Sequence, residues 1–212
     1  MASRYTAQGS ESEFEPGSHG RVLRNRLGIR SVRLMDEAGS LALQIAQDWA
    51  IEHFASGHQF TAEDLCEFHR QWLGAIYPWA GEYRSVNIGK GGFQFAAAHL
   101  LPGLMAELER GPLAKFTPCV PAPVGEVAHA LAVVHAELIL IHPFRDGNGR
   151  LARLLALLMG YQAGLPALDF APLAGRGKRA YIAAIHAALG RDYGPLTALF
   201  ERVIRRVSSS GA

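Results

Sequence analysis

A polar stretch of nine residues separates two strongly apolar segments of this chain. The segment VGEVAHALAVVHAELILI, residues 124–141, is nearly all apolar, and LARLLALLMG, residues 151–160, is almost as apolar. Both are long enough for buried helices. Between them lies HPFRDGNGR, residues 142–150, whose Pro143 and two glycines end the first helix. The pattern therefore predicts two central helices joined by a polar loop, with the second helix starting at about residues 148–150.

The rest of the chain is mostly helical in pattern. Apolar residues recur at helical spacing over residues 36–56, 62–76, 98–110, 178–189 and 195–207. The exception is YPWAGEYRSVNIGKGGFQFAA, which is rich in aromatic and β-branched residues between glycines. It predicts a hairpin over residues 84–95 that turns at residues 89–92. The fold class that follows is all-α, a bundle of about seven or eight helices with one small β-hairpin.

Length and composition favour one globular domain. The chain has 212 residues, of which 49% are hydrophobic and 19% charged, enough for a substantial core. Residues 1–20 are rich in Gly, Ser and Glu, and we expect a flexible N-terminal arm there. We expect the domain to span residues 21–207 and a disordered tail to follow over residues 208–212.

Charge and cysteine content point to a cytoplasmic protein. The net charge of +2 gives no general argument for a nucleic-acid or membrane partner, and we expect the arginines of residues 21–33 to form a solvated face. Cys66 and Cys119 lack metal-site spacing and predict buried thiols in a reducing compartment. The N-terminus has no secretory signal, and no stretch reaches the ~18 uninterrupted apolar residues of a membrane span.

The polar loop has the composition of a polyphosphate site. A helix N-terminus attracts anions through its unpaired N–H groups. Gly147 and Gly149 allow unusual backbone conformations and close approach of a ligand, and Asn148 can add an amide donor. Arg150 and Arg153 lie three residues apart on the new helix, so both reach one side and suit phosphate oxygens.

Two further residues of the loop complete a reaction centre. Asp146 is a natural Mg²⁺ ligand beside a polyphosphate, and His142 suits proton abstraction near neutral pH. Together these features suggest transfer from a nucleotide to a hydroxyl. Each has an ordinary alternative, because Gly-Asn-Gly alone is usually a turn and an arginine pair is usually a solvated face. Their combination in one loop between apolar helices is far less ordinary.

The stretch HPFRDGNGRLAR resembles the signature of the Fic family, HxFx(D/E)GNGRxxR, at every specified position. The resemblance extends over roughly residues 20–207 and implies the Fic fold, with Phe144 anchoring the loop in the core. It implies a protein adenylyltransferase that moves AMP from ATP to a Ser, Thr or Tyr hydroxyl of a target protein. His142 would deprotonate that hydroxyl and Asp146 would bind Mg²⁺. The nucleotide-binding residues would be Gly147, Asn148, Gly149, Arg150 and Arg153, with Tyr181 near the adenine.

The two glycines of the motif bear on which group moves. In the related Doc kinases a Lys replaces the second glycine, and in phosphocholine-transferring relatives an Ala replaces the first. Gly147 and Gly149 therefore favour AMP transfer, with another phosphate-containing group (UMP, phosphate, phosphocholine) or a non-catalytic nucleotide-binding module as the alternatives. The resemblance also implies that the hairpin is a flap that pairs with the target, with Lys90, Phe93 and Phe95 as the contacting residues.

The resemblance carries an expectation about regulation. Fic enzymes are commonly inhibited by a helix with the pattern (S/T)xxxE(G/N), whose Glu pairs with the second arginine of the motif. Only Thr197 and Glu201 have this spacing, and Arg202 follows where Gly or Asn is expected. We therefore expect a bacterial toxin whose inhibitory Glu is supplied by a small antitoxin, with an internal inhibitor at Glu201 as the alternative.

Overall fold

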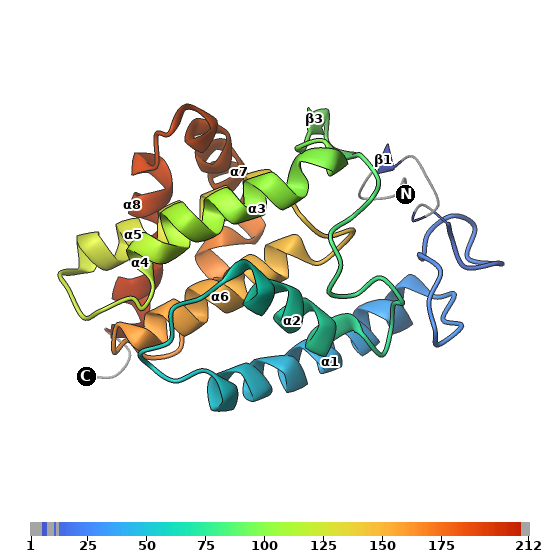
Figure 1. Ribbon diagram of the computed structural model, residues 1–212, viewed down its shortest axis with the longest axis horizontal. Helices are drawn as coiled ribbons and strands as arrows, with labels where there is room; N and C mark the ends of the chain where they lie inside the picture. Colours follow the sequence, from blue (N-terminus) through green and yellow to red (C-terminus); the bar gives the residue numbers. More distant parts are fainter. Residues whose placement is uncertain (1–5, 8–10, 12, 209–212) are drawn as a thin grey trace. The chain divides into compact units, whose positions relative to one another are not determined.

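The computed structural model describes residues 6–7, 11 and 13–208. Its α-helices are α1 (Val32–His53), α2 (Ala62–Leu73), α3 (Leu101–Leu108), α4 (Ala114–Phe116), α5 (Val124–Ile141), α6 (Asn148–Gln162), α7 (Lys178–Ala187) and α8 (Gly194–Ser208) (Figure 1). The expectation of an all-α protein with seven or eight helices and one hairpin is confirmed, α4 being a single turn.

The chain divides into two compact units, each built from segments far apart in the sequence. The first consists of Met1–His53, Ala62–Met105 and Ile141–Asn148, and the second of Phe54–Thr61, Ala106–Leu140 and Gly149–Ala212. This division does not test the domain boundaries that we expect at residues 20 and 207, and they stay predictions.

Helices α1 and α2 pack side by side in the first unit (Figure 1). The buried positions of α1 are the small residues Gly39, Ala46 and Ala50, which let α2 approach closely. Trp72 of α2 is 1% exposed, and its Nε1 donates to the Gly39 carbonyl oxygen (2.8 Å). This packing places one face of α2 against α1. Side chains on the other faces of α2 are therefore available to contact later segments of the chain.

The hairpin of the first unit is confirmed, and it gains a third strand. Strands β2 (Ile88–Lys90) and β3 (Phe93–Gln94) are antiparallel, and β1 (Thr6–Ala7) pairs with the other edge of β2. Gly91 and Gly92 have φ angles of 58° and 83°, which suit the two-residue turn that hairpins prefer. The turn is therefore shorter than the four-residue turn that the glycine pattern suggested.

Helix α5 is the centre of the second unit. His135, near its middle, contacts α6 at Ala152, α7 at Tyr181 and the ring of Phe200 on α8. Within the described residues, α5 is the one helix long and apolar enough to cross a membrane, with a mean hydropathy of 1.7. Because 67% of these 18 residues, Val124–Ile141, are buried, α5 has the character of a core helix.

The third helical segment continues past the point where we expected it to end. Gly111 and Pro112 predicted an end near residue 110, whereas the chain forms a π-helical turn, Glu109–Leu113, and then α4. The wider turn accommodates Pro112 within the helix, and Leu113 is fully buried. Burial of this leucine therefore outweighs the local helix-ending signal.

The described residues of the N-terminal segment make specific contacts, and the expectation of a flexible arm stays a prediction. Of the expected arm, residues 1–5, 8–10 and 12 lie outside the described residues, as does the expected tail beyond Ser208. Phe14 forms a β-bridge with Leu23, and the fully buried Ser18 hydrogen-bonds to Val22. Polar side chains here bond to neighbouring backbone groups, which composition alone does not reveal.

Candidate active site

The first part of the motif is held by buried backbone contacts in the first unit. His142 directly follows α5 with a left-handed φ of 53°, and it is only 4% exposed. Arg84 Nε donates to the His142 carbonyl oxygen (2.8 Å), and Arg84 N donates to the Pro143 carbonyl oxygen (2.9 Å). The Arg84 guanidinium also donates to the carbonyls of Val86 and Ala96 at the two ends of the hairpin. Burial lowers the pKa of Arg84 to about 10.

The hairpin covers the proposed base. The Phe95 ring stacks on the His142 ring, with centroids 3.7 Å apart and an interplanar angle of 17°. Phe93 packs edge-on against Phe95 (5.2 Å), and Lys90 is exposed at the end of β2. Two of the three expected flap residues therefore lie at or next to the base. Their contact with a target stays a prediction.

Phe144 and Asn148 close the loop on itself. Phe144 is fully buried and stacks on His69 of α2 (4.1 Å, 9°), as expected for the anchor of the loop. Asn148 Oδ1 accepts from the Phe144 N–H (2.9 Å), and Asn148 Nδ2 donates to the Phe144 carbonyl oxygen (2.8 Å). We expected a free amide donor for phosphate at Asn148. That expectation is wrong, because the side chain is fully buried and used by the loop; a nucleotide contact there would come from its backbone.

The two glycines of the motif serve different purposes. Gly147 has a φ of 86°, and a Cβ there would lie 2.6 Å from Cζ3 of Trp72. Gly149 lies in α6, and a Cβ there would meet only Nη1 of Arg153, at 3.9 Å. The expectation of an unusual backbone conformation is thus confirmed for Gly147 and wrong for Gly149. For Gly149, close approach of a ligand remains as the predicted reason.

Asp146 is partly exposed, and its backbone carbonyl oxygen lies 3.0 Å from Nε2 of His69. Among the described residues, no group of three or more His, Cys, Asp or Glu side chains could enclose a metal ion. Mg²⁺ is usually held by one or two carboxylates together with phosphates and waters. A single carboxylate in the loop two residues before α6 fits that donor set.

The two arginines of the motif lie in the second unit with a buried polar pair. Burial lowers the pKa of Arg153, the charge of Tyr181 raises it, and the charge of Arg150 lowers it further, so the two guanidiniums lie within electrostatic reach of each other. His135 Nδ1 donates to the Ala152 carbonyl oxygen (3.2 Å), because a carbonyl can only accept, and the Tyr181 hydroxyl then donates to Nε2 (2.8 Å). Burial lowers the pKa of His135 to about 4, so it is neutral.

This pair bears on the expected role of Tyr181. Burial raises the pKa of Tyr181 to about 12, with Arg153 acting in the opposite direction. Its hydroxyl is directed to His135, so an adenine contact, which stays a prediction, would use the ring.

Sequence reasoning missed three residues that hold the motif: His69, Arg84 and His135. Arg84 lies within residues 20–207, over which the chain resembles the Fic family, and this resemblance is the one signal that points to it. Nothing in the local sequence singles out His69.

The comparisons with known proteins show which family this domain belongs to. The model of the Fic/DOC family matches residues 59–159, a range that contains α2, the hairpin and the whole motif. The chain carries a Fic/DOC domain. The Fic domain includes His69 and Arg84 as well as His142.

Known relatives extend the likeness. A protein adenylyltransferase Fic of Nematostella vectensis is 36% identical over 110 residues, which are 50% of this chain and 24% of that protein. The chain spans about a quarter of the length of the curated Fic relatives it matches.

Solved Fic domains share the fold. The N-terminal Fic domain of an effector protein from Bartonella sp. AR 15-3 has a TM-score of 0.75 at 19% identity, over 95% of this chain and 96% of that one. BepC of Bartonella tribocorum, solved with bound AMPPNP, has a TM-score of 0.70 at 24% identity, over 85% of this chain and 91% of that one.

Proposed function

We propose that this Fic domain transfers AMP from ATP to a Ser, Thr or Tyr hydroxyl of a target protein. The observation that carries the proposal is the complete motif from His142 to Arg153, folded as a buried, hydrogen-bonded loop that leads into α6. The names of the curated relatives, which are protein adenylyltransferases, support the same reaction class.

The proposed chemistry assigns one step to each part of the motif. His142 takes the proton of the target hydroxyl while that oxygen attacks the α-phosphorus of ATP. A new phosphorus–oxygen bond forms, the bond between the α-phosphorus and the bridging oxygen breaks, and pyrophosphate leaves. Arg150 and Arg153 bind the β- and γ-phosphates, and the N-terminus of α6 contributes its N–H groups. Asp146 would hold Mg²⁺, which neutralises phosphate charge when bound.

The stacked ring of Phe95 adds a condition to this scheme. His142 is nearly inaccessible while Phe95 covers it. The acceptor hydroxyl therefore reaches the base only if the target displaces Phe95 or enters along its edge. Pairing of the target with the hairpin would place the acceptor beside this ring.

The donor test separates AMP transfer from its alternatives. Incubation with Mg²⁺ and α-³²P-ATP should label a target protein or the enzyme itself, whereas γ-³²P-ATP should not. Label from γ-³²P-ATP alone would indicate phosphate transfer. EDTA should stop the labelling. Nucleotide binding without any label in the presence of candidate targets would favour a non-catalytic binding module.

The base is tested by His142→Ala. This variant should abolish labelling and bind ATP nearly as well as the wild type, because the base acts on the target and not on the nucleotide. His99→Ala, at an exposed histidine of the same unit, is the matched control and should label normally. Labelling by His142→Ala at the wild-type rate would contradict the assignment.

We extend the proposal to a toxin that acts in the cytoplasm and is restrained by a separate antitoxin carrying (S/T)xxxE(G/N). Glu201, the internal alternative, pairs with Arg205 of its own helix (3.3 Å). In the described part of the chain, no carboxylate is among the charges that shift the pKa of Arg153. Expression of the chain alone should slow growth, and co-expression with the antitoxin should relieve this. Unimpaired growth with full labelling activity would remove the toxin role.

A further inference from the structure

We infer that His69 is a positioning residue that holds the backbone of Asp146 and thereby sets the metal affinity of the nucleotide site. The inference rests on the proposed role of Asp146 as the Mg²⁺ ligand. It concerns a residue of α2 that lies 77 positions before Asp146 in the sequence.

The hydrogen bonds of His69 determine its tautomer. The Gly81 N–H donates to His69 Nδ1 (2.9 Å), so Nδ1 carries no proton. In the neutral ring the proton is therefore on Nε2, which donates to the carbonyl oxygen of Asp146 (3.0 Å). One imidazole thus connects the 81–84 segment to the motif loop, with a defined direction for each hydrogen bond.

The ring has little freedom to move. His69 is fully buried, stacks on Phe144 (4.1 Å, 9°) and meets Trp72 edge-on (6.1 Å). A Cβ at Gly147 would lie 3.5 Å from His69 Nε2, so the loop passes close to this nitrogen. The hydrogen bond to Asp146 is consequently made from a fixed point on a helix.

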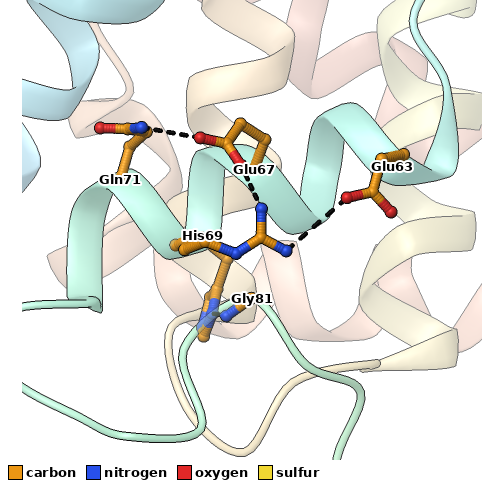
Figure 2. A network of polar contacts seen from close by, with 6 residues as sticks. Glu63, Glu67, His69, Gln71 and Gly81 are labelled. Atoms are coloured by element: carbon orange, nitrogen blue, oxygen red, sulfur yellow. Dashed lines mark hydrogen bonds and ion pairs between the residues drawn. The ribbon is translucent and has the colours of Figure 1, made fainter.

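Neighbouring side chains of α2 serve a different purpose. Figure 2 shows Glu63, Glu67 and Gln71 along the helix, and His69 reaching to the segment that carries Gly81. Arg70 pairs with Glu67 and Glu63 on an exposed face, where such pairs contribute about 0–1 kcal/mol. His69 is the member of this group that turns inward to the motif.

The position of Asp146 matters because few protein side chains would coordinate the metal ion. With no cluster of three or more ligating side chains in the described residues, one carboxylate would supply the protein's part of the coordination. Changing the hydrogen-bond partners that orient metal ligands typically lowers metal affinity about 10–100-fold. Loss of the His69 Nε2 donor should therefore weaken metal-dependent nucleotide binding more than it weakens the fold.

Two amide substitutions distinguish the role of His69 Nε2 from that of Nδ1. In His69→Gln the terminal amide can take the place of Nε2 and donate to Asp146, whereas in His69→Asn the shorter amide can replace only Nδ1, which faces Gly81. Both variants lose the ring that stacks on Phe144. A role limited to the stacking of this ring would therefore affect them alike.

The experiment measures fluorescent ATP-analogue binding during a Mg²⁺ titration, together with the urea unfolding midpoint without Mg²⁺ or nucleotide. We expect His69→Asn to raise the half-saturating Mg²⁺ concentration about tenfold or more, and His69→Gln to stay within about threefold of wild type. The unfolding midpoints of the two variants should be similar. Gln71→Ala, on the exposed side of the same helix, is the control and should match wild type.

The outcomes distinguish this inference from the proposed function. Equal Mg²⁺ requirements for His69→Asn and His69→Gln would overturn the positioning role, even if the wild type transfers AMP. Nucleotide binding by the wild type without any dependence on Mg²⁺ would overturn it as well. If no target or enzyme is labelled but the contrast between the two variants holds, AMP transfer is refuted and the positioning role stands.

Discussion

Gly147→Ala should destabilise the fold strongly, whereas Gly149→Ala, two residues away, should not. The φ of 86° at Gly147 is left-handed, and an L-residue there costs about 1–2 kcal/mol. The new Cβ would also lie 2.6 Å from Cζ3 and 3.0 Å from Cη2 of Trp72. Trp72 is held by its hydrogen bond to Gly39, so relieving the overlap should cost about 1–3 kcal/mol more.

The expected total for Gly147→Ala is a loss of about 2–5 kcal/mol in the free energy of unfolding. Gly149→Ala places its Cβ 3.9 Å from Arg153 Nη1, an ordinary contact. Ala is favoured over Gly in a helix by up to about 1 kcal/mol, so this variant should be as stable as wild type or slightly more stable. Urea unfolding, followed by circular dichroism, measures both. Equal midpoints for the two variants, or a larger loss for Gly149→Ala, would refute the reasoning.

Three other predictions follow from burial and charge. The pKa of His135 in the folded protein is about 4 against an ordinary 6.5, so the stability that the neutral ring contributes is complete above pH 6.5 and is lost as the pH falls towards 4. The free energy of unfolding should be about 2 kcal/mol lower at pH 5 than at pH 7, and His135→Gln should remove this difference. Burial raises the pKa of both Cys66 and Cys119 to about 11, so thiol reagents at pH 8 should react slowly until urea unfolds the chain, and rapid reaction of the native protein would contradict this. Glu201→Gly should not raise labelling by the purified chain, and should cost about 1 kcal/mol of stability in α8; a large gain in labelling would reveal an internal inhibitor.

The positions of the helices could be predicted because their signals are local. The bounds of α5 were predicted to the residue, since an apolar run followed by Pro143 marks both its burial and its end. The start of α6 followed from the glycines and the helical spacing of the arginines. Where the local signal was misleading, as at Pro112, the burial of Leu113 overrode it.

Local sequence patterns therefore predicted the fold class, the hairpin and the place of the motif, because these depend on contiguous residues. How the motif is held depends on contacts between residues far apart in the chain. His69 and Arg84 reach Asp146 and His142 from 77 and 58 positions away. The burial of Asn148 turned an expected phosphate donor into a clamp on Phe144, and the approach of Phe95 covered His142. Hydrogen bonds and ring contacts depend on distance in space, and a polar side chain buried away from water takes whichever partner the fold brings to it.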